Sequence, residues 1–487
     1  MSPIFNNVNR ILPGSYTKTD ATGLITTSLA PGGIVGMIGT AYGGEPNAVY
    51  RFTSSSLATE TFKSGKLLDA MKAAWLNGAN DIYAIRIGAA SKSVITLIDA
   101  SSGDVLTLES RDYGTWTNDI EIKIESGTNF GYKLSIRYID ENNNITLESS
   151  SGAGAIRQYD DIANVTELAS VIDEFSSLLT VNTIHDADAT IVSINYTKLT
   201  MGSDGLLDAD DEIITTVDDW TTALSLFDTY DINILNPAGT DSATIHALFL
   251  QHCIELSSKE KYRICVVGGG SDDNIGDVNN PSSDPESSIG RAYNLNHERA
   301  IFTATGVNGE NAAYTASLIT GKLAGFDAAT SLTFKTLNGI SSVNTKYTQT
   351  QKEDLLMRGC LVVEEAPAGR RVIRDVTTKQ DIRLGLTEDP YKDITTVRIA
   401  DYTNTNLRDI LQDIYIGKKG VSGARSAIAN TTLSILSKLQ GLEIISNYRN
   451  IQVTQDADNA KIFRVSVEVI PVFTITWIFI STTLSNS

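Results

Sequence analysis

Three consecutive glycines, Gly268, Gly269 and Gly270, follow an apolar segment and have the composition of a phosphate-binding loop. The backbone N–H groups of such a loop bind phosphate only when the glycines have a particular spacing. The dinucleotide pattern G-x-G-x-x-G requires a glycine where Asp273 stands, and no G-x-x-x-x-G-K-[ST] motif occurs in the chain. Asp272 and Asp273 would also repel a phosphate. We therefore favour a simple turn after a strand over a nucleotide site.

Two acidic clusters carry oxygens of the kind that a hard cation such as Ca²⁺ binds. They contain Asp272, Asp273, Asn274 and Asp277 in one segment and Asp208, Asp210 and Glu212 in another. Neither cluster has the glycine and the terminal glutamate at the positions that an EF-hand loop requires. We favour solvated acidic loops over cation sites and predict no bound metal.

Residues that could act as nucleophiles or metal ligands are present, but their spacing matches no known catalytic motif. The histidines, which show neither H-E-x-x-H nor H-x₃-H spacing, are His185, His246, His252 and His297. Ala424 interrupts the nucleophile-elbow pattern G-x-S-x-G that begins at Gly420. We therefore predict a protein with no catalytic residue, no cofactor and no enzymatic activity.

Composition narrows the class of protein. The chain has 487 residues, of which 41% are hydrophobic and 20% are charged, as in a folded protein. A formal net charge of -19 argues against binding to nucleic acid or to an anionic membrane. The three cysteines are widely spaced, which favours a reducing compartment. No signal peptide and no apolar run long enough for a membrane span are recognised, so we expect assembly in a cytoplasm without membrane insertion.

The apolar periodicity predicts a multidomain α/β protein. A buried strand at 33–39, a helix at 67–75 and a strand at 81–87 form a βαβ unit, which starts a parallel sheet. Short alternating segments then predict an antiparallel β-rich insertion, which includes a helix at 165–179. The α/β pattern resumes with a helix that carries 245–252, a strand at 262–267 and a helix at 312–323, and a C-terminal α+β domain follows. The predicted parts are an N-terminal arm (1–22), core (23–89), insertion (90–215), core (216–350), C-terminal domain (351–470) and C-terminal arm (471–487).

The end of the chain reads as two consecutive apolar strands, 462–470 and 473–484, separated by Pro471. Before them we expect a helix at 352–358, strands at 361–364 and 395–399, and helices at 406–415 and 424–439. An apolar terminal strand needs a partner, because its bare edge would template aggregation. The residues alone favour pairing within the chain over pairing with another copy.

Charge is distributed unevenly along the chain. Between Asp186 and Asp219 there are nine acidic residues and one lysine, whereas the segment 368–425 contains eleven basic and eight acidic residues. Within that segment Lys418, Lys419 and Arg425 surround the start of a predicted helix. On spacing alone we favour a solvated basic turn there over a docking face for an acidic partner.

Several motifs, in their order and spacing, resemble those of contractile tail sheath proteins. In the N-terminal half they are PGSY at 13–16, IVGMIGTA at 34–41, GGEPN at 43–47 and NGANDIYAIRI at 77–87. In the C-terminal half they are YIGK at 415–418 and the terminal segment 465–484. The resemblance covers nearly the whole chain except the insertion.

The resemblance implies a structural subunit that polymerises in stacked rings around a tail tube and contracts to drive the tube through a cell envelope. It further implies that the terminal arms leave their own subunit and add strands to neighbours. The expected subunit-linking residues are Tyr16, Val465, Val467, Val469, Ile475, Trp477 and Phe479. Lys418, Lys419 and Arg425 would face the tube. The implied partners are further copies of the chain, the tail tube, the baseplate and the tail terminator, in a virion tail.

Two other functions remain open from the sequence. The nearest is the sheath of a phage-like bacteriocin or extracellular injection particle, which is the same machine without a genome. The other is an α/β hydrolase or nucleotide-binding enzyme that carries a β-rich insertion.

Overall fold

The computed structural model describes residues 33–140, 144–147, 159–269, 274–380, 389–420, 423–476 and 478–482, and two short paired strands, β1 (Ile4–Phe5) and β2 (Val8–Asn9). The chain divides into two compact units, and we describe each by itself. The first comprises Gly33–Ile394 with Thr476–Ser487, and the second comprises Met1–Gly32 with Thr395–Ile475.

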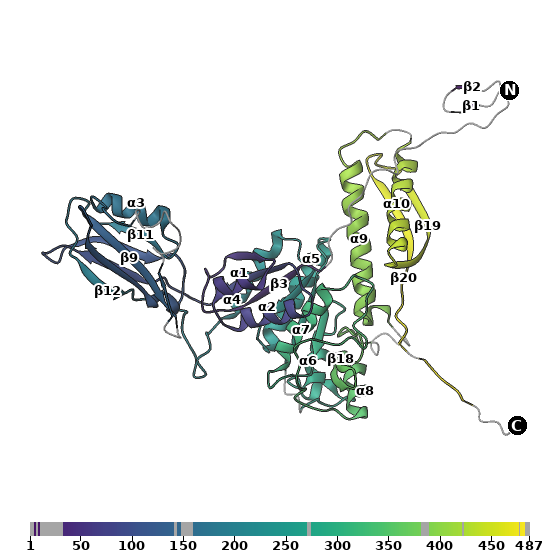
Figure 1. Ribbon diagram of the computed structural model, residues 1–487. Helices are drawn as coiled ribbons and strands as arrows, with labels where there is room; N and C mark the ends of the chain where they lie inside the picture. Colours follow the sequence, from purple (N-terminus) through teal and green to yellow (C-terminus); the bar gives the residue numbers. More distant parts are fainter. Residues whose placement is uncertain are drawn as a thin grey trace. The chain divides into compact units, whose positions relative to one another are not determined.

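A seven-stranded sheet forms the centre of the first unit (Figure 1). Its strands, in spatial order, are β16 (Cys360–Leu361), β15 (Ala300–Thr303), β14 (Ile264–Gly268), β13 (Ile234–Pro237), β3 (Val35–Thr40), β5 (Ile82–Ile87) and β4 (Val49–Phe52). All neighbouring pairs are parallel except β4 with β5. The parallel pairing of β3 with β5 confirms the predicted βαβ unit.

Helices cover both faces of this sheet, which explains why its strands are almost continuously apolar. Ile38 packs in one cluster with residues of α4 (Val217–Leu226) and α5 (Ala243–Ser258), whereas its neighbour Met37 packs in another with α1 (Ser55–Phe62) and α2 (Lys66–Leu76). Successive strand residues point to opposite faces, so these clusters lie on opposite sides of the sheet. The core of the unit also contains α6 (Ser288–Leu295), α7 (Ala312–Ala324) and α8 (Gln349–Met357).

Between β5 and α4 the chain forms an insertion of two antiparallel sheets with its own hydrophobic core. One sheet contains β10 (Ile145–Leu147), β9 (Tyr132–Ile139), β8 (Ile120–Ser126) and β12 (Ile194–Lys198), and the other contains β11 (Leu179–Ile184), β7 (Asp104–Ser110) and β6 (Val94–Ile98). Helix α3 (Val165–Phe175) packs on β11 (Figure 1). The sequence predicted this helix to run to residue 179. Because it ends at Phe175, the chain has room for β11.

The segment from 351 to 394 lies in the first unit, although we expected the C-terminal domain to begin at residue 351. The reason is that β16 pairs with β15 and so extends the central sheet. The predicted strand at 361–364 is divided in two: after β16, the chain forms a hairpin of β17 (Val363–Ala366) and β18 (Gly369–Val372). The division between units therefore falls at Thr395, and the other predicted boundaries stay predictions.

The second unit contains α9 (Ile394–Tyr415), α10 (Ala424–Gly441), β19 (Ile445–Gln455) and β20 (Phe463–Pro471). The predicted strand at 395–399 is wrong, because these residues form the first turns of α9. The β-branched run from Thr395 to Val397 favours a strand locally. Ile394, Val397, Leu407, Ile410 and Ile414 nevertheless recur at helical spacing over the whole element, and that longer pattern decides the structure. Among the described residues, no helix has the length and apolar content that crossing a bilayer would require.

Candidate assembly interface

The hairpin of β19 and β20 contains three of the predicted linking residues. Its register runs from Gln455 opposite Phe463 to Ile445 opposite Pro471 and contains two irregularities. Polar contacts tie the strands together: Arg449 Nε lies 2.6 Å from a Glu468 carboxylate oxygen, and the Asn450 side-chain amide donates to the other oxygen at 2.7 Å. The predicted strand at 462–470 is therefore present as β20, and the sequence missed its partner β19.

Helix α10 supports one side of the hairpin. Its buried residues Ile428, Ile435, Leu436 and Leu439 form the inner stripe of an amphipathic helix that packs on β19. Side-chain contacts fix the arrangement: the hydroxyl oxygens of Ser437 and Tyr448 lie 2.8 Å apart. We infer that the hairpin is held at a defined place in the second unit.

The hairpin has an open edge on each side. In the part of the chain that the structure describes, β19 pairs with β20 alone and β20 with β19 alone. The outward-facing N–H and C=O groups of both strands can thus accept a further strand. Val465 is 36% exposed, whereas Val467 and Val469 are partly buried. The sheet is accordingly incomplete in the isolated chain.

The segment after β20 exposes a run of large apolar side chains. We call 472–482 the C-terminal segment. The second predicted terminal strand is not formed here, since the described residues 472–476 and 478–482 belong to no strand. Ile475 is 79% exposed and Phe479 is 94% exposed, and Phe473, Ile478 and Ile480 are exposed as well. Two other predicted linking residues, Tyr16 and Trp477, lie outside the described residues. An exposed, uncharged apolar run of this kind is typical of segments that contact a partner.

The predicted tube-facing residues lie at the turn between α9 and α10. Gly417, with a φ of +80°, allows the chain to leave α9, and the hydroxyls of Tyr415 and Thr431 join the two helices at 2.6 Å. Lys418, Lys419 and Arg425 are exposed, and no ion pair of theirs occurs among the described residues. By contrast, Arg371 of β18 is paired with Glu364 at 2.9 Å. The cations of the α9–α10 turn thus remain available to an outside partner.

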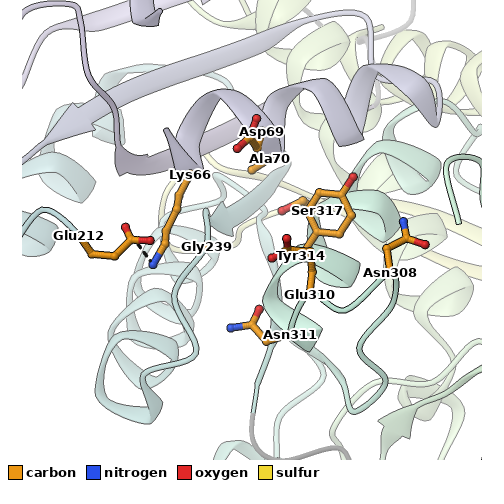
Figure 2. Close-up of a pocket in the computed structure, with 10 residues that line it drawn as sticks. All are labelled: Lys66, Asp69, Ala70, Glu212, Gly239, Asn308, Glu310, Asn311, Tyr314 and Ser317. Carbon is orange, nitrogen blue, oxygen red and sulfur yellow. Dashed lines mark ion pairs between the residues drawn. The ribbon is translucent and has the colours of Figure 1, made fainter. Parts of the chain in front are cut away.

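A polar groove lies beside the carboxyl ends of β3 and β13, where ligands bind in many open α/β sheets. Its volume is about 530 Å³. Figure 2 shows its only lysine, Lys66, directed at Glu212, which lies 3.2 Å away. Asp69 and Glu310 add two more carboxylates. Such a lining disfavours phosphate, and the described residues contain no metal-binding group of three or more His, Cys, Asp or Glu.

Packing explains the glycines that first resembled a phosphate loop. A Cβ at Gly268 would collide with the Ala312 carbonyl at the start of α7, and a Cβ at Gly269 would meet Asp241 at 2.7 Å. Gly270 lies outside the described residues. Gly268 and Gly269 are therefore the residues that fit where a strand end meets a helix start.

Comparisons with known proteins agree over most of the chain. The phage tail sheath protein central domain matches residues 215–378, and the phage tail sheath C-terminal domain matches residues 387–484, together more than half of the chain. The chain belongs to the contractile phage tail sheath family. It is 24% identical to the tail sheath protein of Bacillus phage SP01, over 92% of this chain and 92% of that protein. Members of this family are structural proteins of phage tails.

Solved sheath structures share the fold of this sheath protein. The sheath tail protein of Desulfitobacterium hafniense has a TM-score of 0.66 at 15% identity, covering 94% of this chain and 100% of that one. The contracted helical sheath of the anti-feeding prophage has a TM-score of 0.54 at 12% identity, covering 98% and 99%. The mixed α/β architecture, with several sheets, is therefore that of sheath proteins.

Proposed function

We propose that this chain is the subunit of a contractile tail sheath that polymerises in stacked rings around a tail tube. Contraction of the lattice drives the tube through the host cell envelope. The observation that carries this proposal is the match to a phage tail sheath protein over 92% of both chains. The fold likeness to a helical sheath in its contracted state adds support.

Exchanged β-strands link the subunits in this proposal. The C-terminal segment of one subunit adds to the open β19–β20 hairpin of another, and the N-terminal arm, including Tyr16, adds to the same sheet. Val465, Val467 and Val469 belong to the receiving strand, whereas Ile475, Trp477 and Phe479 belong to the donated one. The exposed apolar side chains and the two open edges support this assignment.

The exchanged-strand contact should be stable enough to hold two subunits together while they move during contraction. Each main-chain hydrogen bond contributes about 0.5–1.5 kcal/mol net, and burying a side chain such as Ile or Phe contributes about 1.5–3 kcal/mol. The free energies of several hydrogen bonds and several buried side chains add up, so the link stays formed while one subunit rotates against another. Main-chain hydrogen bonds also move with the strands that form them, so the link need not break when subunits rotate.

The basic turn faces the tail tube in this proposal. Lys418, Lys419 and Arg425 attract an acidic tube surface, which orients the subunit during assembly. The further partners are the baseplate and the tail terminator at the two ends of the sheath. The sheath assembles in the host cytoplasm and becomes part of the virion tail.

Negative-stain electron microscopy of the purified chain tests the proposal. We expect rings or short tubes that lengthen with protein concentration. A chain that elutes as a monomer, forms no polymer with or without tail tubes and gains thermal stability from a nucleotide would contradict it and favour the enzyme alternative. Neighbouring capsid genes would separate a phage sheath from that of a bacteriocin or extracellular injection particle.

A further inference from the structure

A buried ion pair crosses the joint between the insertion and the core of the first unit. Arg86 lies near the end of β5, and one of its guanidinium nitrogens is 2.9 Å from a carboxylate oxygen of Asp204. The side chains are 0% and 3% exposed. The other terminal nitrogen of Arg86 donates to the Gly44 carbonyl at 2.9 Å. Arg86 thus connects β5 and the Gly44 loop of the core with the segment that returns from the insertion.

Asp204 in turn holds the loop that follows β7. Its second carboxylate oxygen accepts a hydrogen bond from the backbone N–H of Thr115 at 2.9 Å and another from the Thr115 hydroxyl. Gly114 has a φ of +107°, and a Cβ there would collide with the Asp204 carboxylate. The loop can approach the ion pair this closely because residue 114 is glycine.

A second set of contacts also joins the core to the insertion, again with the cation on the core side. The carboxylate of Asp112 accepts the backbone N–H of Gly44 at 2.9 Å, and Lys63 Nζ lies 4.0 Å from the ring centroid of Trp116. Burial raises the pKa of Asp112 and lowers that of Lys63. In both sets the core supplies the cation, and the insertion with its return segment supplies the anion or the aromatic ring.

Buried charges of this kind specify geometry more than they add stability. A buried ion pair gains little over apolar residues of the same volume, whereas removing one partner leaves an uncompensated charge at high cost. A movement that shifts the Asp204 segment by a few ångströms against β5 would separate Arg86 from Asp204. A similar shift between Asp204 and the loop after β7 would leave the N–H of Thr115 without its acceptor. The joint therefore has one arrangement that keeps the Arg86–Asp204 ion pair and the Thr115 hydrogen bonds together, although Arg86 Nε is buried there without a hydrogen-bond partner.

We propose that Arg86 is a positioning residue that fixes the insertion relative to the core, so that the first unit moves as one rigid body. Only the purpose of this rigidity, to carry the insertion along when the sheath contracts, rests on the proposed function. The joint itself can be tested on the free chain. A chain that fails to polymerise would contradict the proposed function and leave the joint test intact.

Distance measurements by double electron–electron resonance test the rigidity. Leu57 of α1 and Phe130 of the insertion are 55% and 58% exposed, and the native cysteines are all buried, so spin labels at L57C and F130C attach selectively. Labelled chains are diluted with unlabelled ones to suppress distances between subunits. We expect one narrow distribution in the otherwise native chain and a distribution about twofold broader after Arg86→Met. A native distribution as broad as that of the variant would overturn the proposal.

Hydrogen exchange separates a local effect from general unfolding. In Arg86→Met the amides of Gly44 and Thr115 should exchange about tenfold faster, while those of β8 and β14 keep their native rates. Lys198→Met is the control, because it removes an exposed 2.7 Å ion pair with Asp119 inside the insertion. If Arg86→Met unfolds the chain, Asp204→Asn keeps the shape of the joint and should give the same local pattern. Unchanged rates at Gly44 and Thr115 in a folded variant would overturn the proposal.

Discussion

Ile445 of β19 lies opposite Pro471 of β20, and this is the last pair in the register of the hairpin. Proline has no backbone N–H, so the ladder cannot continue in the usual way beyond this point. The Ser446 hydroxyl oxygen lies 3.0 Å from the Ile470 carbonyl oxygen and 3.1 Å from that of Pro471. The C-terminal segment therefore begins at a defined place on the hairpin.

Deleting residues 472–487 should abolish polymerisation and leave the monomer folded. The exposed side chains of the C-terminal segment contribute little packing, so we expect the free energy of unfolding to change by less than about 0.5 kcal/mol. Circular dichroism and electron microscopy of the same samples measure both properties. Normal tubes from the shortened chain would contradict the strand exchange.

Single charges in the C-terminal segment should have the same effect as the deletion. Phe479→Asp places a carboxylate where a neighbour's sheet would have to bury it, and we expect no tubes. Phe130→Asp changes an exposed aromatic residue of the insertion and should assemble normally. Equal assembly of the two variants would argue that the C-terminal segment stays exposed in the sheath.

Reversing the charges of the basic turn should weaken assembly on the tube. The triple variant K418E/K419E/R425E loses the attraction to an acidic partner, and co-sedimentation with purified tubes measures the loss. Native co-assembly should also weaken with salt, because the screening length falls to about 3 Å at 1 M. A control with Lys72, Lys133 and Lys461 changed to Glu alters the net charge equally elsewhere. If both triple variants bind tubes alike, the turn is only a solvated face.

Two buried histidines should make the first unit sensitive to acid. Burial lowers the pKa of His246 and His252 to about 4 from an ordinary value of 6.5. Between these values the unfolded chain binds protons that the folded chain does not. Stability is therefore fully present above pH 6.5 and falls with pH, by up to about 1.4 kcal/mol per pH unit for each histidine. Arg263 donates to His252 Nε2 at 2.8 Å, and this contact requires the neutral ring.

Denaturant titrations from pH 7 to pH 4 measure this dependence. His246→Gln should reduce the slope, because glutamine binds no proton in this range. His185→Gln changes a histidine whose ring nitrogen contacts the exposed Thr107 hydroxyl, and it serves as the control. A slope that His246→Gln leaves unchanged would exclude this histidine as a source of the acid sensitivity.

Substituting Gly268 should reveal its packing role. The new methyl group of Gly268→Ala meets the backbone of α7, so we expect a loss of about 1–3 kcal/mol in the free energy of unfolding. Gly441→Ala in the last turn of α10 meets no atom within 4 Å and should be neutral or stabilising. If Gly268→Ala has native stability, close packing against α7 does not explain the glycine at this position.

Sequence patterns predicted the elements that are buried and strongly periodic. The βαβ unit, β14, α5 and α7 follow from apolar runs and helical spacing, because burial on both faces leaves few polar residues in these segments. The β19 strand escaped prediction because it is exposed and polar, and only Ile451 and Val453 signal its alternation. β16, with two residues, is too short to show a pattern at all.

The joint at Arg86 could not be predicted from local patterns. Arg86 and Asp204 are 118 residues apart, and their pairing depends on how the insertion folds back. One signal was present: an arginine stands inside the otherwise apolar strand Ile82–Ile87, where an isolated charge is costly. The basic turn was recognised, but only the structure shows that its cations form no ion pair with the other residues it describes.

The two open edges of the β19–β20 hairpin have a consequence for the order of assembly. A two-stranded ribbon is only marginally stable, and added strands stabilise it. In the strand exchange that we propose, each subunit that joins therefore rigidifies the hairpin of the one before it, whereas the hairpin of a free subunit stays a two-stranded ribbon. We expect polymer growth to show a lag and a critical concentration, so that an unassembled pool persists until a preformed ring provides the template.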